Sequence, residues 1–243
     1  MRGSAVMCAK GLLTERSVTF TVGSLFYNPK SRIIRDLGVL ALAVLGQQRA
    51  DAEPLRVLDA MAGSGVRSLR YASEVDGIGV IHSNELMEGA HPLQANLAPL
   101  LADGSGVDFR LTAEDAVDLY LRARLSGERY DLVDCDAFGT GQPHTAEAWW
   151  AVAKGGLLYL CATDSCATAG HNPHKVMSGY AAVAKYHPSC NEQGLRLLLG
   201  AAWREAAQRN LHAEPMFAFF DRPSSSFRVT SCLGWPLVSY GLR

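Results

Sequence analysis

The sequence of 243 residues contains no C-x-x-C pair, and its six cysteines are scattered along the chain. This spacing does not fit a zinc framework, so we expect no metal and read the cysteines as reduced, small apolar residues. No apolar run is long enough to span a bilayer. The N-terminus also lacks the apolar core of a signal peptide. We therefore expect a cytoplasmic protein with no membrane partner.

An excess of either charge is also missing, because 23 basic and 24 acidic residues give a formal net charge of -1. A surface for nucleic acid must therefore be local. With 48% hydrophobic residues, the length suits one α/β domain with a small appendage. We predict an N-terminal arm and helix over residues 1–50 and the main domain over residues 51–243.

The stretch RVLDAMAGSGVRSLR, residues 56–70, organises the chain. An apolar strand ends at Asp59, Gly63 and Gly65 make a tight turn, and a helix follows. In doubly wound α/β folds this turn lies at the carboxyl end of the first strand, where ligands bind. The glycines let a ligand approach the backbone. Because Ser68 replaces the third glycine of G-x-G-x-x-G, a nucleotide-type cofactor site and an ordinary tight turn both remain open.

Two acidic positions follow later strands of the pattern. Glu85 comes just after a strand at 79–82, about 20 residues past the glycine turn, where an acid usually holds a ribose diol. A helix-capping acid is the alternative, and Glu88 competes for the role. Asp115 and Ala116 follow a strand at 107–111, where an acid and a small residue suit an adenine ring. An ordinary acid at a helix N-terminus is the alternative there.

The strand at 130–134 leads into Cys135 and then Asp136-Ala137-Phe138-Gly139. A buried strand that presents an aromatic ring at the carboxyl edge of a sheet requires an explanation. A base can stack on that ring while nearby acceptors hold an exocyclic amine. The alternative is that Phe138 packs beneath a loop.

The rest of the sequence also predicts alternating helices and strands, as in an α/β fold. We expect a small hairpin or an extended arm within residues 11–28 and a turn at 26–29. An amphipathic helix should begin at Ser31, with its apolar face at Ile33, Ile34, Leu37, Leu40, Ala41 and Val44. Arg35 in that helix reads as a solvated arginine. Further helices are expected at 65–74, 90–101, around Trp149-Trp150 and at 192–210, and strands at 157–162, 213–220 and 226–233. The long polar loop at 165–190 interleaves lysine, histidine and tyrosine, which suits phosphate and base contacts.

Several stretches taken together resemble the tRNA (guanine-26-N2)-dimethyltransferase family of class I S-adenosylmethionine-dependent methyltransferases. They are FYNPKSRIIRDLGV, VLDAMAGSGVRSLRYA, YDLVDCDAFGT, GGLLYLCATD and CNEQGLRLLL, in the family's order, over most of residues 26–233. The resemblance implies an α/β fold with a class I methyltransferase (Rossmann-like) sheet, a parallel core, an antiparallel last strand and a small N-terminal extension. Residues 51–243 would then be the S-adenosylmethionine-dependent methyltransferase domain.

The resemblance also implies roles for single residues. The implied cofactor-binding residues are Arg35, Asp59, Gly63, Gly65, Arg67, Glu85, Asp115 and Ala116. Arg67 would lie near the methionine carboxylate of S-adenosylmethionine, and Glu85 would hold the ribose where the family more often has aspartate. The implied catalytic residues are Asp136, Ala137 and Phe138, which match the family's D-P-F/Y-G tetrad.

The activity implied is methyl transfer to the exocyclic N2 of a guanine at position 26 of tRNA, once or twice. Asp136 would accept an amine N–H, the carbonyl of Ala137 the other, and Phe138 would stack on the extruded guanine. Ala137 replaces the family's proline, which would stiffen the turn. The family's C-terminal domain, which helps to grip tRNA, is not expected within these residues. A methyltransferase for another amine, in rRNA, DNA or protein, and a non-catalytic cofactor- and RNA-binding module remain as alternatives.

Overall fold

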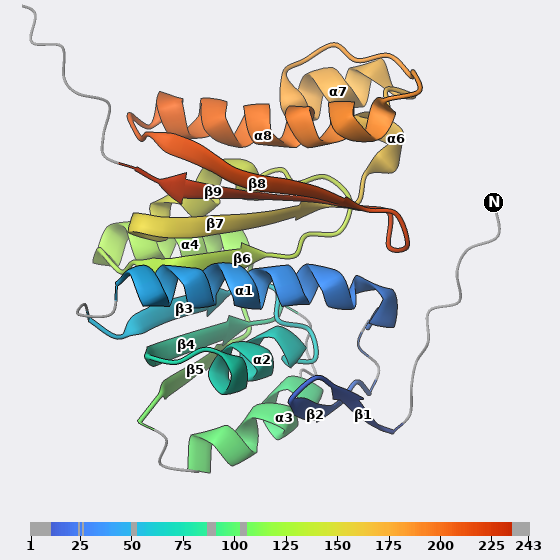
Figure 1. Cartoon of the computed structure of the whole chain (residues 1–243). Helices are drawn as coiled ribbons and strands as arrows, with labels where there is room; N and C mark the ends of the chain where they lie inside the picture. Colours follow the sequence, from blue (N-terminus) through green and yellow to red (C-terminus); the bar gives the residue numbers. More distant parts are fainter. Residues whose placement is uncertain are drawn as a thin grey trace, which may run out of the picture. The chain divides into compact units, whose positions relative to one another are not determined.

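The computed structural model describes residues 11–23, 25, 27–49, 53–86, 91–102 and 106–234. The chain divides into two compact units, residues 1–116 and 117–243. Figure 1 labels the helices and strands of the chain. Cys8, Phe26 of the predicted turn and Glu88 lie outside the described residues. The domain boundary after residue 50 stays a prediction.

The first unit opens with the predicted hairpin. Strands β1 (Leu12–Glu15) and β2 (Val18–Thr21) pair antiparallel, with Leu13 opposite Phe20. One face of β2 is buried, because Val18 and Phe20 belong to a core that also contains Val66 and Leu97 from two helices of the same unit. The hairpin is therefore packed into the first unit.

A 3-10 helix, η1 (Pro29–Ser31), leads into helix α1 (Arg32–Gln48), which confirms the predicted helix. Its buried face differs from the predicted one. The buried residues are Ile34, Arg35, Gly38, Val39, Leu42 and Leu45. Ile33, Leu40 and Val44 are instead 48%, 57% and 43% exposed, so the predicted stripe was wrong at these positions. Apolar residues on both sides of the helix leave two stripes possible, and only packing selects one.

Arg35 is buried, so its interpretation as a solvated arginine was wrong. Its Nε and Nη2 donate to the two carboxylate oxygens of Glu15, at 2.8 and 2.5 Å. Arg70 also reaches Glu15, from Nη1 to Oε1 at 3.0 Å, and Tyr27 donates its hydroxyl to Oε2 at 2.7 Å. This buried cluster joins β1, α1 and the helix that carries Arg70.

Three parallel strands form the sheet of the first unit. They are β3 (Leu55–Asp59), β4 (Ile78–Asn84) and β5 (Asp108–Thr112), in the order β5-β4-β3. Val57 lies opposite Ile81, and Ile81 lies opposite Phe109. Helix α2 (Val66–Glu74) connects β3 to β4, and α3 (His91–Ala102) precedes β5. These elements agree with the predicted ones to within a few residues.

The second unit holds four strands, β6 (Tyr130–Cys135), β7 (Val152–Ala162), β8 (Ala213–Asp221) and β9 (Ser226–Leu233), in the order β6-β7-β9-β8. β6 and β7 are parallel, whereas β9 runs antiparallel to both β7 and β8. Parallel strands in both units and an antiparallel last strand confirm the predicted fold class. Helix α4 (Ala116–Ser126) precedes β6.

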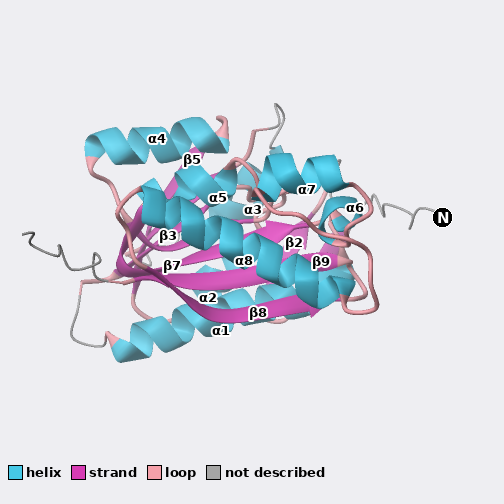
Figure 2. Ribbon diagram, turned by 90° about the horizontal axis from the view of Figure 1, so that it is seen from above, coloured by secondary structure: helices cyan, strands magenta, loops and turns pink. Residues whose placement is uncertain are grey.

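Helix α8 (Cys190–Gln208) packs on β8 and β9, as Figure 2 shows. The helix predicted around Trp149-Trp150 consists of two short elements, α5 (His144–Glu147) and the 3-10 helix η2 (Ala148–Trp150). The Trp149 indole is buried and donates from Nε1 to the carbonyl of Ala202 at 3.0 Å.

The stretch at 165–190 is not the continuous loop that the sequence predicted. It contains α6 (Ser165–Thr168) and α7 (Pro173–Tyr180), and both pack on α8. The helices begin where Asp164 and Asn172 accept backbone N–H groups of Ala167 and Lys175. Short capped helices escape a reading based on periodicity, because they contain too few turns to show one.

Among the described residues, no helix is both long and apolar enough to cross a membrane. No disulfide joins the five cysteines in this part of the chain.

Candidate functional site

The glycine turn follows the carboxyl end of β3, as predicted. Gly63 and Gly65 have φ angles of 54° and 81°, a region that favours glycine strongly. A Cβ atom on Gly65 would lie 2.7 Å from Cδ1 of Leu93, which is closer than such contacts occur. Gly65 is also the residue that caps α2. The backbone conformation therefore favours glycine at both positions, and an added Cβ at Gly65 would also require Leu93 to shift.

Asp59 lies beneath this turn and is fully buried. Its Oδ2 accepts from the Ser68 hydroxyl at 2.7 Å, and Ser68 also contacts the Ser83 hydroxyl at 2.6 Å. Ser68, which stands where the third glycine of the dinucleotide motif would be, thus ties the first turn of α2 to β3 and β4. Asp59 thus helps to fix the start of α2 through its hydrogen bond with Ser68. A contact between Asp59 and a cofactor stays a prediction.

Glu85 lies next to the glycine turn. Its Oε2 accepts from the backbone N–H of Gly63 at 2.7 Å, and its own N–H donates to the carbonyl of Thr112 at 3.2 Å. The half-buried carboxylate is thus placed beside a backbone that no Cβ covers. A carboxylate in this position fits a ribose diol beside a Gly-rich turn, so the residues present suit a nucleoside cofactor.

The buried side chain of Asn84 holds the three strand ends of this unit together. Its Nδ2 donates to the carbonyls of Ala60 and Glu114 at 3.1 and 2.9 Å. Its Oδ1 accepts from the Thr112 hydroxyl at 2.8 Å. The sequence reading named only Glu85 at this place. The run of three polar residues, His82-Ser83-Asn84, at the end of β4 was the signal for such a contact.

The other predicted cofactor residues of the first unit lie in different settings. Arg35 directs three donors to Glu15 and to the carbonyl of Asn28. Arg67 is buried in α2, at 4% exposure. Asp115 is exposed immediately before α4, and Ala116 is buried as the first residue of that helix. The contacts of these four residues with a cofactor stay predictions.

In the second unit, Asp136, Ala137 and Phe138 follow β6 directly. Ala137 is buried, whereas the Phe138 ring is 71% exposed. The alternative in which Phe138 packs beneath a loop is therefore wrong. An exposed ring beside a half-buried carboxylate is an arrangement that a planar base can use.

Asp136 is held by a residue that the sequence reading missed. Arg228 of β9, only 2% exposed at its side chain, forms an ion pair from Nη2 to Oδ1 of Asp136. The guanidinium also lies over the ring of Tyr159, at 5.5 Å from the ring centre. The signal was available, since an arginine in an apolar strand is rarely buried without an anionic partner. The sequence did not show which residue that anionic partner is.

The turn itself is fastened to the end of β7. Gly139, with a φ of 73°, donates its N–H to the Thr163 hydroxyl at 2.7 Å. Its carbonyl accepts from the backbone N–H groups of Thr163 and Asp164, at 2.8 and 2.9 Å. Three hydrogen bonds from one glycine therefore restrain the turn in which Ala137 stands where the resemblance expects proline.

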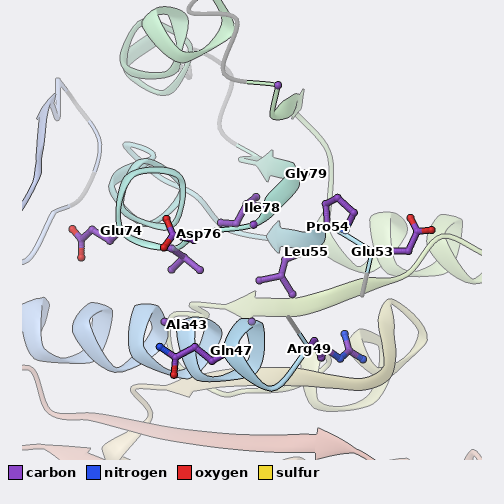
Figure 3. A pocket seen from close by; sticks show the side chains of 14 residues that line it. Ala43, Gln47, Arg49, Glu53, Pro54, Leu55, Glu74, Asp76, Ile78 and Gly79 are labelled. Atoms are coloured by element: carbon purple, nitrogen blue, oxygen red, sulfur yellow. The ribbon is translucent and has the colours of Figure 1, made fainter. Parts of the chain in front are cut away.

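A cavity of about 570 Å³ lies elsewhere in the first unit (Figure 3). It lies at the amino ends of β3 and β4, where Leu55 and Ile78 begin the strands. Glu53 and Asp76 make its lining acidic. Gly63 and Glu85 follow the opposite, carboxyl ends, where ligands of such sheets bind. We therefore do not assign the cofactor to this cavity.

Comparison with known proteins decides the family. The family model for the N2,N2-dimethylguanosine tRNA methyltransferases (TRM) matches residues 9–223. The chain belongs to this family. As a member of the TRM family it carries the glycine turn, the acid after β4 and the Asp-Ala-Phe-Gly turn that the sequence singled out.

Named relatives agree with this assignment. A tRNA (guanine(26)-N(2))-dimethyltransferase of Pyrobaculum arsenaticum is 34% identical over 197 residues, which cover 81% of this chain and 52% of the relative. A protein of the same name from Caenorhabditis elegans is 30% identical over 222 residues, with 80% of this chain and 41% of the relative covered. This TRM family chain thus spans about half the length of the curated relatives it matches.

Solved structures show the same fold. Trm1 from Pyrococcus horikoshii, in complex with S-adenosyl-L-methionine, superposes with a TM-score of 0.81 at 25% identity, over 92% of this chain and 61% of that one. Trm5b from Pyrococcus abyssi superposes with a TM-score of 0.62 at 12% identity, over 92% and 56%. The second likeness supports the fold of this TRM family member alone.

Proposed function

We propose that the chain transfers methyl groups from S-adenosylmethionine to the exocyclic N2 of guanine 26 in cytoplasmic tRNA. Family membership and the names of the relatives support this substrate and this cofactor. The single structural observation that carries the proposal is the exposed Phe138 ring, which follows the Arg228-bound carboxylate of Asp136 in the chain.

The chemistry asks for alignment more than for a strong base. The N2 amine of guanine is a weak nucleophile, because its lone pair is delocalised into the ring. When bound, S-adenosylmethionine would supply a methyl group on a positively charged sulfur, whose S–CH3 bond would break to leave the neutral thioether S-adenosylhomocysteine. Asp136 would accept one N–H of the amine and take up the proton released as the new C–N bond forms. The carbonyl of Ala137 would accept the second N–H, and Phe138 would stack on the base.

Residues of the first unit would hold the cofactor. Gly63 leaves its backbone uncovered except beside Glu85, and Gly65 sets the start of α2. Glu85 would accept hydrogen bonds from the ribose hydroxyls. Asp115 and Ala116 would receive the adenine, and Arg67 the methionine carboxylate. Arg35 already binds Glu15, so we assign it to shaping this unit more than to contacting the cofactor directly.

The direct test is label transfer. The purified chain is incubated with S-adenosylmethionine tritiated in its methyl group and an unmodified tRNA transcript, followed by digestion to nucleosides. We expect label in N2-methylated guanosine, and none with a transcript that carries adenosine at position 26. Label in another RNA or in protein alone would favour a different amine substrate. Cofactor binding without transfer to any of these would favour a non-catalytic module.

Replacing Glu85 with alanine tests the ribose assignment. We expect the Kd for S-adenosylmethionine to rise about tenfold to a hundredfold, because hydrogen bonds to a charged group contribute about 1.5–3 kcal/mol. Glu85→Gln should be intermediate, since an amide oxygen can still accept from Gly63 without the charge. Calorimetric titration measures the effect, with the exposed Glu53→Ala as the control. An unchanged Kd in Glu85→Ala would remove Glu85 from the cofactor site.

Replacing Arg228 tests how Asp136 is positioned. In Arg228→Met we expect kcat for methyl transfer to fall about a hundredfold, because a carboxylate that is free to rotate loses the aligned geometry. Arg228→Lys keeps the charge and should recover part of the rate. The KM for S-adenosylmethionine should remain unchanged in both. If kcat fell only in proportion to the fraction of folded protein, Arg228 would have a structural role alone.

A further inference from the structure

The segment from Ser165 to Asn191, which contains α6 and α7, carries no aspartate or glutamate. It contains two lysines, Lys175 and Lys185, and three histidines. Both lysines are exposed, as are His171 and Tyr186. We define the lysine–tyrosine surface as Lys175, Lys185, His171 and Tyr186. It is a local basic surface on a chain whose net charge is close to zero.

We propose that the lysine–tyrosine surface binds the RNA strand that flanks the guanosine to be methylated. The lysines would pair with phosphates, and the Tyr186 ring would stack on an unpaired base. The proposal rests on the proposed function, because it assigns a contact surface to the same substrate.

Packing contacts within the segment hold the lysine–tyrosine surface in place. His171 and Tyr186 stack with their ring centres 4.6 Å apart and their planes at 21°. Gly170, with a φ of 83°, lies so close to the backbone of Lys185 that a Cβ would come within 2.4 Å of it. The two arms of the segment are therefore packed together. Tyr186 is nevertheless 63% exposed, so most of its surface remains accessible to a ligand.

His187 helps to hold this arrangement and takes no part in the basic surface. The backbone N–H of Ser189 donates to its Nδ1 at 3.1 Å, so that nitrogen carries a lone pair. Its Nε2 therefore holds the hydrogen and donates to Oε1 of Gln193 at 3.1 Å. Gln193 in turn donates to the carbonyl of Thr168 at 3.2 Å. The neutral ring thus links the end of the segment to α6.

The surface is anchored to the turn that carries Phe138. Asp164, whose N–H binds the carbonyl of Gly139 at 2.9 Å, is also the residue that caps α6. Further along the segment, Gly179 of α7 lies against the Thr140 side chain, since a Cβ there would be 3.5 Å from its Oγ1. The segment that carries the lysine–tyrosine surface therefore packs at two points on the residues that follow Phe138. We expect an RNA strand bound to this surface to lead toward the base that Phe138 receives.

The composition favours RNA over a protein partner. Lysine is depleted in protein–protein interfaces, whereas lysines beside exposed aromatic rings are typical of surfaces that bind single-stranded nucleic acid. Two acids flank the segment along the chain. Asp164 accepts from the backbone N–H of Ala167 at 3.2 Å as the cap of α6. Glu192 accepts from Arg196 at 2.9 Å, within an i,i+4 pair on α8. Its charge is therefore already balanced by a basic side chain.

The test measures binding of an unmodified, fluorescently labelled tRNA transcript to the whole chain over a range of salt concentrations. In the double variant Lys175→Glu and Lys185→Glu we expect at least a tenfold increase in Kd at low salt. The slope of log K against log salt should decrease in magnitude by about 1.4, because each contact with a single strand contributes about 0.7. Tyr186→Ala should weaken binding about tenfold with the slope unchanged, since stacking releases no counterions.

The matched control is Lys154→Glu, which makes the same charge change at an exposed lysine of β7. Its effect on Kd should be less than half that of the double variant, measured as log Kd, since it reverses one charge outside the proposed surface. If the double variant and Tyr186→Ala bound tRNA like the wild type, or if the wild type bound no tRNA, the surface assignment would be overturned. Methyl transfer is measured separately. Binding through this surface without methyl transfer would overturn the proposed function and leave the surface standing.

Discussion

Replacing Asp136 with alanine is expected to lower kcat for methyl transfer by about 10²–10⁴-fold, the range for loss of a positioned proton acceptor. The exposed Phe138 remains in this variant, so the guanine can still stack, but its amine loses the acceptor that orients it. The rate is measured in single turnovers with tritiated S-adenosylmethionine and a tRNA transcript. Asp136→Asn should retain part of the rate, because an amide oxygen still accepts an N–H.

The Kd for S-adenosylmethionine should stay within about twofold of the wild type, since Glu85 and the glycine turn are untouched. Asp118→Ala, at an exposed position of α4, serves as the control and should transfer at the wild-type rate. A wild-type kcat in Asp136→Ala would show that the carboxylate takes no part in the reaction. The Asp-Ala-Phe-Gly turn would then need another explanation.

Replacing Glu15 with glutamine is expected to lower the free energy of unfolding by about 3–5 kcal/mol, the usual cost of breaking a buried ion pair from one side. Arg35 would then lose the carboxylate that accepts from its Nε and Nη2. Arg70 would keep Asp36 and Glu74 as partners, at 2.7 and 2.8 Å. Arg35 therefore accounts for most of the expected loss.

Urea unfolding measures this loss as a lower transition midpoint with an unchanged m value. The matched control is Glu192→Gln, which breaks an exposed i,i+4 pair with Arg196. That change should cost less than about 0.5 kcal/mol, because exposed pairs are screened by water. If both variants lost the same free energy of unfolding, the buried Glu15 pair would be no more stabilising than the exposed Glu192 pair.

The same carboxylate sets a pH dependence. Burial alone would raise the pKa of Glu15, but hydrogen bonds and charge from Arg35, with Tyr27 and Arg70, hold it below the ordinary value of 4.5. The ionised Glu15 carboxylate therefore contributes fully to the free energy of unfolding at pH values above its unfolded pKa. This contribution is lost as the pH falls through the pKa of Glu15 in the folded protein. Burial and the bond to Glu15 raise the pKa of Tyr27 to about 12, so Tyr27 stays a donor throughout.

Unfolding curves recorded between neutral pH and about pH 3 check this sign. The difference between the wild type and Glu15→Gln should be constant down to about pH 5 and should shrink below it. A difference that grew on acidification would show that the carboxyl is protonated more easily in the folded protein than in the unfolded chain.

Local features of the chain could be read from the sequence because their causes are local. The turn at Gly63 and Gly65 follows from positive φ angles that glycine tolerates, and the flanking strand and helix follow from apolar periodicity. The strands of the hairpin and the turn after β6 were predicted on similar local grounds. The antiparallel last strand was predicted from the family resemblance. The exposure of Phe138 confirmed that the ring is presented rather than packed.

Tertiary structure decided what depends on residues far apart in the chain. The partner of Asp136 is Arg228, 92 residues away, and Glu15 binds Arg70 from 55 residues away. It also decided which face of α1 is buried. Arg35, which the sequence indicated as a surface residue, is buried in the structure. Periodicity predicts that a helix has an apolar face. Only the neighbouring elements determine which side chains are buried and which buried charges must form ion pairs.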